Sequence, residues 1–171
     1  VVHRPKEIET GSFSKTISIT FLSWKNELPK NCKPIIVQNV LVSTSKITAQ
    51  FYPDSIHDNF DNSVNPIEET YFKEKVKFGR NVLIGDNVTI GSNCSIGHNT
   101  IIEHNVSIGN NCTIGSNVIV RNTLIKDNVT FLDNCIIGKH GFGFFPVNNK
   151  NLRYPHIGIV IIEDNCEIGC G

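Results

Sequence analysis

The sequence predicts a mostly β protein in which a parallel β-helix follows a small α/β module. Two observations predict the β-helix. A bulky apolar residue returns about every six positions from Phe72 onward, and Gly and Asn recur at fixed places after it, as in the blocks IGDNVT, IGSNCS and IGNNCT. A period of this kind is typical of a β-helix, in which each repeat supplies one short strand and one corner.

The repeated apolar residues, here called anchors, define the expected core. Because side chains alternate along a strand, each anchor and the residue four places later point inward. The anchors are Phe72, Phe78, Ile84, Ile90, Ile96, Ile102, Ile108, Ile114, Val120, Ile125, Phe131 and Ile137. The second inward places hold compact residues: Val76, Val82, Val88, Cys94, Thr100, Val106, Cys112, Val118, Val129 and Cys135. We expect stacked coils to join these side chains into one continuous core.

The corners and the cysteines fit the same interpretation. Gly and Asn tolerate the left-handed backbone region that a sharp bend between flat strands requires. Cys94, Cys112, Cys135 and Cys166 fall on compact inward places, so we interpret them as core residues rather than as a disulfide framework. There is no Cys-x-x-Cys pair, and no metal site is expected.

Residues 1–70 lack the repeat and are expected to form a separate, shortened α/β module that ends in a linker. Ser18–Leu22 and Pro34–Val37 are typical of short strands. Asn39 is placed to cap a helix, and Pro53–Thr70 has a linker composition rich in Asp, Asn and Pro. The predicted helix has one face made of Val40, Thr44, Ile47 and Phe51.

Composition limits the function classes. Of 171 residues, 39% are hydrophobic, which suffices for one or two small domains with a core. Sixteen basic and sixteen acidic residues give a formal net charge of zero, so the overall charge does not favour binding to nucleic acid or to an anionic membrane. No apolar run is long enough for a membrane-spanning helix, and no signal peptide is visible, so we expect a cytoplasmic protein.

The repeat breaks between residues 138 and 159 and returns at Ile162 and Ile168. The inserted segment, which includes GKHGFGFFPVNNKNLRYPHIG, is rich in Gly and aromatic residues. Long loops that leave a rigid solenoid often carry its binding function. Phe142, Gly143 and Phe144 are therefore candidate substrate-binding residues, with His140 and His156 ranked below them, although a mere surface excursion remains an alternative.

This segment, with the returning repeat IIEDNCEIG, resembles the UDP-3-O-acylglucosamine N-acyltransferases of lipid A, and hence lipopolysaccharide, biosynthesis. The resemblance covers the upstream repeats and extends more weakly to ITFLSW and the segment from Leu28 to Pro53. It implies a left-handed β-helix, residues 71–171 here, and a homotrimer with active sites between subunits. The implied reaction transfers a 3-hydroxyacyl group from acyl carrier protein to the 2-amine of UDP-3-O-acylglucosamine, with no cofactor beyond the thioester.

Two departures from the family pattern concern its functional residues. The stretch LSWKNELPK after Phe21 lacks the Asn and Tyr of the family's uridine pocket, so only Phe21 is carried over as a possible uracil-stacking residue. The family's general base is a histidine in an Ile-x-His-Asn repeat beyond the aromatic loop, which places it past Gly171. His104, in Ile102-Glu103-His104-Asn105, has the same letters but precedes the loop, so we interpret it as a surface corner look-alike.

The chain begins at Val1 and stops within a repeat at Gly171, which favours a truncated fragment that is inactive alone. Two alternatives to the N-acyltransferase remain open at this point. One is a non-catalytic β-helix that serves as a scaffold or interaction module. The other is a different hexapeptide-repeat acyltransferase, and the aromatic loop and the N-terminal module argue against it.

Overall fold

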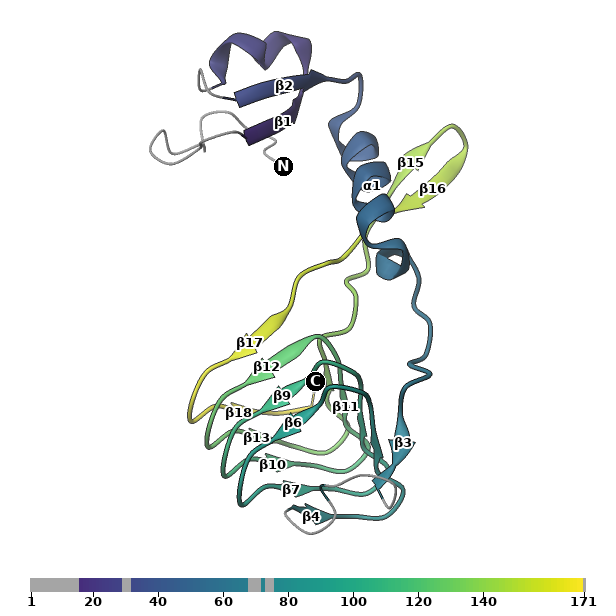
Figure 1. Cartoon of the computed structure of the whole chain (residues 1–171). Helices are drawn as coiled ribbons and strands as arrows, with labels where there is room; N and C mark the ends of the chain where they lie inside the picture. The colour runs from purple at the N-terminus through teal and green to yellow at the C-terminus, as the bar shows by residue number, and fades with distance from the viewer. Residues whose placement is uncertain (1–15, 29–31, 68–71, 73–75, 171) are drawn as a thin grey trace. The chain divides into compact units, whose positions relative to one another are not determined.

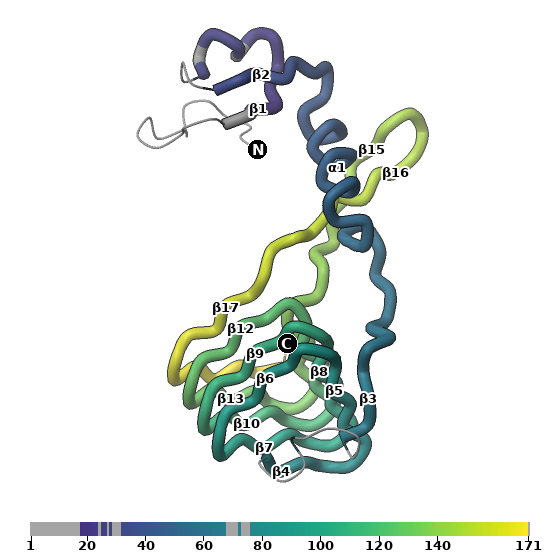
Figure 2. Tube along the Cα trace, in the orientation of Figure 1, coloured from purple at the N-terminus to yellow at the C-terminus, as the bar shows by residue number. Residues whose placement is uncertain are grey.

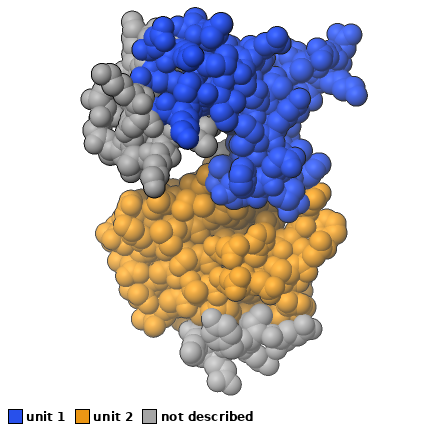
Figure 3. Space-filling view, turned by 45° about the horizontal axis from the view of Figure 1, so that its top comes forward, with its two compact units in different colours: residues 1–58, 142–157 blue, residues 59–141, 158–171 orange. Residues whose placement is uncertain are grey.

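The computed structural model describes residues 16–28, 32–67, 72 and 76–170. The first residues of the predicted N-terminal module, the end of the predicted linker and Gly171 lie outside this set. The described residues are mostly β, with many short parallel strands in stacked sheets and a single α-helix, so the predicted fold class is confirmed. The chain divides into two compact units, residues 1–58 with 142–157 and residues 59–141 with 158–171 (Figure 3).

In the first unit, β1 (Thr16–Thr20) and β2 (Cys32–Ile36) pair in parallel. β1 begins two residues before the predicted strand, and Leu22 opens the 3-10 helix η2 (Leu22–Glu27) instead of ending the strand. The pairing with β2 ends at Thr20, so the chain is free to turn there, and the Leu22 side chain is 70% exposed. The prediction of two strands is right, while that of their ends is wrong by one to two residues.

The helix α1 (Val40–Phe51) begins where the sequence predicts. Asn39 caps it, since its Oδ1 accepts a hydrogen bond from the N–H of Val42 at 3.1 Å. Val40 and Thr44 are buried, whereas Phe51 at the other end of the same face is 76% exposed. The apolar stripe of α1 is therefore covered only over its first turns.

The second unit is the β-helix, whose coils follow one another along the tube of Figure 2. Three sheets form its sides (Figure 1). The first contains β4 (Lys77–Phe78), β7 (Ser95–Ile96), β10 (Thr113–Ile114), β13 (Thr130–Phe131) and β18 (Glu167–Ile168). The second contains β5 (Leu83–Ile84), β8 (Ile101–Ile102), β11 (Ile119–Val120) and β14 (Ile136–Ile137). The third contains β6 (Thr89–Ile90), β9 (Ser107–Ile108), β12 (Thr123–Ile125) and β17 (Val160–Ile162).

The inward ladders form one core, as the repeat predicts. Ile102, Val106, Cys112, Val118 and Val120 are completely buried, and the core cluster runs without a break from Ile67 to Ile162. Most stacked partners lie 18 residues apart, as Ser95 and Thr113 do. The spacing drops to 17 for Asn111 and Asn128, because the step from Val120 to Ile125 is one residue shorter than the others. All six cysteines are free thiols, and Cys94, Cys112 and Cys135 are buried in the core.

The outward positions differ from side to side. On the second sheet the outward residues of the four coil strands are aliphatic, namely Leu83, Ile101, Ile119 and Ile136. On the first sheet the outward residues are polar or charged: Lys77, Ser95, Thr113, Thr130 and Glu167. One side of the column thus carries an apolar stripe, of which Ile136 is 56% exposed.

The corners are formed by asparagines in the left-handed region of backbone conformation. Their φ angles range from 43° at Asn122 to 66° at Asn134. Their side chains stack into ladders. Asn99 Nδ2 donates to Asn117 Oδ1 at 3.3 Å, and Asn117 Nδ2 donates to Asn134 Oδ1 at 3.3 Å. Asparagine suits this place because it combines tolerance of positive φ with a side chain that bonds to the coil above and below.

Replacing Asn117 with alanine is expected to lower the free energy of unfolding by about 1–2 kcal/mol, because the backbone stays at φ 57° and two ladder bonds are lost. Asn117→Gly relieves the backbone but not the ladder, so its loss should be smaller. Urea unfolding of both variants measures the two effects. An equal loss for the two would show that the backbone conformation is not the main cause.

The predicted linker has more structure than its composition suggests. Pro53–Ile56 forms the 3-10 helix η3, and β3 (Asn65–Pro66) pairs antiparallel with β5. Ile67, next to β3, is buried in the core cluster. Residues 61–67 of the predicted linker are therefore part of the β-helix and not a free tether.

Candidate functional site

The inserted segment folds into a β-hairpin within the first unit. β15 (Phe144–Val147) pairs antiparallel with β16 (Lys150–Arg153), and Asn148 and Asn149 turn the chain with φ of 47° and 61°. Two asparagines in the left-handed region match the tight turn of a two-residue hairpin. The insertion is thus a regular β-hairpin that carries aromatic side chains, and not an irregular loop.

The predicted binding residues lie at the base of this hairpin. The rings of Phe142 and Phe144 meet edge to face with centroids 5.3 Å apart, and they are 94% and 49% exposed. Gly143 lies between them, and its carbonyl accepts a hydrogen bond from the N–H of Tyr154 at 2.9 Å. An aromatic pair with this much exposed apolar surface is suited to contact an apolar ligand.

Side-chain and main-chain contacts fix the hairpin to the rest of the first unit. Ser45 Oγ donates to the carbonyl oxygen of Arg153 at 3.4 Å, and the His156 N–H donates to the carbonyl oxygen of Ser55 at 3.2 Å. The Arg153 guanidinium lies 4.0 Å from the Asp58 carboxylate. The hairpin is therefore held by α1 and by η3.

Of the lower-ranked candidates, His156 packs its ring against Tyr154 with centroids 6.0 Å apart. His140 is half-buried at the start of the insertion. Phe21, the proposed uracil-stacking residue, is half-buried at the end of β1, one residue before η2. The structure thus pairs Phe142 with Phe144, while Phe21 belongs to a different part of the first unit.

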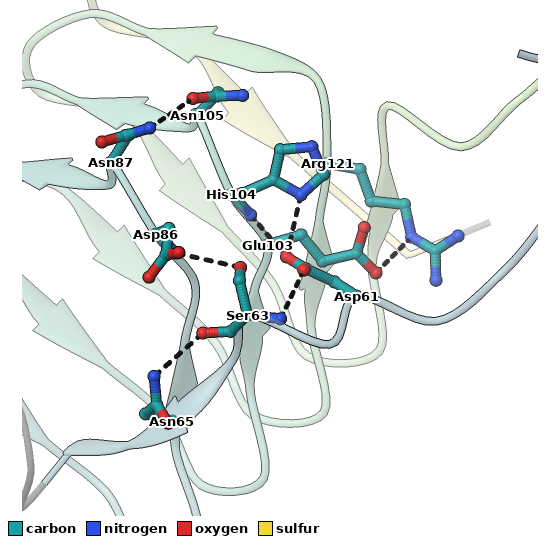
Figure 4. Close-up of polar contacts among 9 residues, drawn as sticks. All are labelled: Asp61, Ser63, Asn65, Asp86, Asn87, Glu103, His104, Asn105 and Arg121. Atoms are coloured by element: carbon teal, nitrogen blue, oxygen red, sulfur yellow. Dashed lines mark hydrogen bonds and ion pairs between the residues drawn. The ribbon is translucent and has the colours of Figure 1, made fainter. Parts of the chain in front are cut away.

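A second polar site lies on the β-helix, where the segment after Phe60 crosses two corners (Figure 4). The Asp61 carboxylate, 7% exposed, accepts hydrogen bonds from the N–H groups of Ser63 at 2.8 Å and His104 at 2.7 Å. Its Oδ2 also lies 3.0 Å from His104 Nδ1. The absence of a side chain on Gly85 permits this approach, since a Cβ there would lie 2.9 Å from Asp61 Oδ2.

An ion pair lies beside this contact in Figure 4. Arg121 Nε is 3.0 Å from Glu103 Oε1, with side chains 19% and 12% exposed. Sequence reasoning placed His104 on a surface corner, and its side chain is indeed 50% exposed. It missed Asp61 as the partner, because the two residues are 43 positions apart and no local pattern connects them. The Asp-rich composition of the segment was the only available signal.

Asp61 is ionised at neutral pH. Burial of the carboxylate raises its pKa, but hydrogen bonds from Ser63 and His104 outweigh burial and lower the pKa of Asp61 from 3.8 to about 2. A lowered carboxyl pKa means that the folded state favours the charged form of Asp61. The contribution of Asp61 to the free energy of unfolding is therefore fully present above about pH 4, where the carboxyl group of the unfolded chain is also ionised.

The stability that Asp61 contributes should therefore be lost as the pH falls from about 4 to about 2. Asp61→Asn removes this titration. The difference in unfolding free energy between wild type and variant should be constant near neutral pH and shrink below about pH 4. Urea unfolding at a series of pH values measures it, and a difference that stays unchanged down to pH 2 would contradict the assignment.

Among the residues that the structure describes, no group of three or more His, Cys, Asp or Glu side chains is placed to hold a metal ion. Nor does any helix in that part of the chain have the length and apolar character needed to cross a membrane.

The fold and its corners define the chain as a hexapeptide-repeat β-helix protein with an aromatic hairpin inserted between coils. The profile of the family described as "GMPPB C-terminal domain" matches residues 78–141, which lie within the β-helix and are less than half of the chain.

Short stretches are similar to proteins named UDP-3-O-acylglucosamine N-acyltransferase. Identity is 57% over 35 residues to that of Phocaeicola vulgatus, 56% over 34 residues to that of Idiomarina loihiensis and 42% over 36 residues to that of Synechococcus. The first two matches each cover 20% of this chain and 10% of the relative, and the third covers 21% and 10%. The chain is therefore similar to an acyltransferase family over about a fifth of its length.

Proposed function

We propose that this chain is part of an N-acyltransferase of lipid A biosynthesis that acts in the cytoplasm. It would transfer a 3-hydroxyacyl group from the thioester of acyl carrier protein to the 2-amine of UDP-3-O-acylglucosamine. The observation that carries the proposal is the exposed pair of Phe142 and Phe144 at the base of a hairpin that interrupts the coils. The names of the relatives support the choice of reaction.

The aromatic pair suits the apolar part of such substrates. An acyl chain buries apolar area on whatever surface it contacts, and two edge-to-face rings provide such a surface without burying a charge. In this proposal Phe142 and Phe144 contact the substrate. Gly143 has no side chain, so nothing projects between the two rings that could block the substrate. Phe21 is proposed to stack on the uracil ring.

The proposed assembly is a homotrimer, and the aliphatic stripe of Leu83, Ile101, Ile119 and Ile136 supports it. A continuous apolar stripe on one side of the column is the kind of surface that contacts between copies cover. The same stripe favours the second candidate function, a non-catalytic β-helix that serves as a scaffold for assembly.

An acyl-transfer assay separates the two functions. The full-length protein that contains this chain is incubated with 3-hydroxyacyl acyl carrier protein and UDP-3-O-acylglucosamine, and the N-acylated product is followed by mass spectrometry. We expect product, and we expect the double replacement of Phe142 and Phe144 by alanine to lower kcat/KM by about tenfold or more, since each ring contact is worth about 1–2 kcal/mol.

Leu132→Ala is the control, because Leu132 is 44% exposed on the β-helix and lies outside the hairpin. Its kcat/KM should match the wild type. A full-length protein that forms no product and binds neither substrate would overturn the enzyme proposal and favour the scaffold. Light scattering on the same sample gives the number of copies in the assembly.

A further inference from the structure

Residues 61–67, here called the cap segment, close one side of the β-helix at the end where its coils begin. β3, which belongs to this segment, is the outermost strand of the second sheet and pairs antiparallel with β5. The coil strands of the same sheet pair in parallel, so β3 is not a further coil. In the other two sheets, the outermost strands at this end among those that the structure describes are β4 and β6. The cap segment therefore lies where a preceding coil would lie.

The cap segment also makes the main-chain hydrogen bond that a preceding coil would make. Within the column, the N–H of Leu83 donates to the carbonyl oxygen of Thr100 in the following coil at 3.0 Å. Val82 is the equivalent of Thr100 in the first coil, and its carbonyl oxygen accepts the N–H of Ile67 at 3.2 Å. The side chain of Ile67 is 6% exposed and belongs to the core cluster of the column. The first coil is thus paired and covered on this side.

A second set of bonds involves outward N–H groups at the corners of the column. At most corners a side chain of the following coil accepts this hydrogen bond. Arg80 N–H donates to His98 Nδ1 at 2.8 Å, and His98 N–H donates to Ser116 Oγ at 3.2 Å. Ser92 N–H donates to Asn110 Oδ1 at 2.9 Å in the same way. Each coil therefore caps the corner of the coil before it.

The corner between the second and third sides departs from this rule. The connection between β11 and β12 is one residue short, and the N–H of His104 is capped by Asp61 at 2.7 Å rather than by the following coil. The His104 ring is turned to the Asp61 carboxylate, and the N–H of Asp86 donates to Ser63 Oγ at 3.0 Å (Figure 4). The cap segment therefore bonds to corner groups of the first two coils.

The outer edge of β3 is unsuited to further pairing. Bonded and non-bonded residue pairs alternate along an antiparallel ladder, and Ile67 is the residue that bonds to Val82. The main chain of Pro66, which lies opposite Leu83, therefore faces away from β5. Proline has no N–H to donate at this edge, and a proline in an edge strand is one of the means by which proteins stop a sheet from growing.

We propose that the cap segment prevents this end of the column from pairing with the same end of a second copy of the chain. The edge of β5 accepts an antiparallel strand, as β3 shows, and a two-fold axis would present the β5 of a second copy in that orientation. Without the cap segment, the Val82 carbonyl and the N–H groups of Asp86 and His104 lose their partners. An open edge of this kind is a template for association.

This role goes beyond the proposed acyl transfer and does not depend on it. The cap segment leaves the aliphatic stripe on the side of the column available for contacts between copies, while it blocks contacts at the end. A strand on one side is sufficient, because an end-to-end contact requires all three sides of the two columns to meet.

Light scattering from the full-length protein over a range of concentrations tests the proposal. The release variant combines Asp61→Ala, Ser63→Ala and Ile67→Ala, which removes both corner caps and the buried side chain. Its mass should rise with concentration to about twice the wild-type value, since a two-fold contact is closed once two partners have met. A synthetic peptide with the sequence of residues 59–67, NFDNSVNPI, should restore the wild-type mass because it refills the place of β3.

Two further variants make the test specific, and circular dichroism verifies that each is folded. Val118→Ala is the control for lost stability, because Val118 is completely buried next to β11 and outside the cap segment, and it should keep the wild-type mass. Pro66→Val keeps the capping side chains and adds an outward N–H, so it should associate more weakly than the release variant. The proposal is overturned if both cap variants keep the wild-type mass, if Val118→Ala associates equally, or if the release variant grows without limit.

Discussion

Replacing Gly138 with valine is expected to lower the free energy of unfolding of the β-helix by at least about 3 kcal/mol. Gly138 has φ +73°, and a Cβ there would overlap the carbonyl oxygen of Arg121 and lie 2.8 Å from Thr123 Oγ1. A β-branched residue cannot adopt this conformation, and the neighbour that it meets is backbone, which cannot move aside.

Gly138 also starts the insertion, and its carbonyl oxygen accepts a hydrogen bond from Asn122 Nδ2 at 3.3 Å. The same variant should therefore disturb the point at which the chain leaves the coil. Its loss of acyl transfer should be larger than that of a variant that loses the same unfolding free energy at a site away from the insertion. Gly158→Val is the matched control at the other end of the insertion, where an added Cβ meets nothing within 4 Å. Urea unfolding compares the two, and equal losses would contradict the steric argument.

Phe131→Ala should cost about 3–5 kcal/mol, the usual range for a phenylalanine removed from a close-packed core. Phe131 is 1% exposed and stacks between Ile114 of the coil before it and Ile168 of the coil after it. The space left inside the column is enclosed by main chain on all three sides, so neighbouring side chains have little freedom to fill it.

Two further variants make this prediction specific. Phe142→Ala removes the same ring from a side chain that is 94% exposed, so its unfolding free energy should change by less than about 0.5 kcal/mol. Phe131→Leu should lose much less than Phe131→Ala because it fills most of the space. If Phe131→Ala and Phe142→Ala unfold at the same urea concentration, the Phe131 ring is not part of a packed core.

The β-helix was predictable because its interactions repeat. One rule, two inward side chains in each six residues, places Ile102 and Val106 in the core and also finds Ile162 after the insertion. The positive φ of the corner asparagines follows from the same period. Even the short step between Val120 and Ile125 was visible in the spacing of the anchors.

The remaining features depend on contacts that have no period. The ends of β1 are set by its pairing with β2, so the apolar run alone misplaced Leu22. The turn of His104 toward Asp61 depends on a segment 43 residues away and on the short step that removes the usual cap. Sequence letters around His98 and His104 are nearly the same, and only the tertiary partners give the two imidazoles opposite hydrogen-bonding roles.

The stacking interval of 18 residues has an evolutionary consequence. A segment of that length can be duplicated or lost as a unit, because the flanking coils present the same hydrogen-bonding edge and the same inward side chains on either side of the junction. A change of one residue is tolerated within a coil, as at the short step between Val120 and Ile125, whereas a long insertion leaves the run of coils, as the segment between β14 and β17 does. The number of stacked coils and the length and sequence of the inserted loops can therefore change independently during evolution.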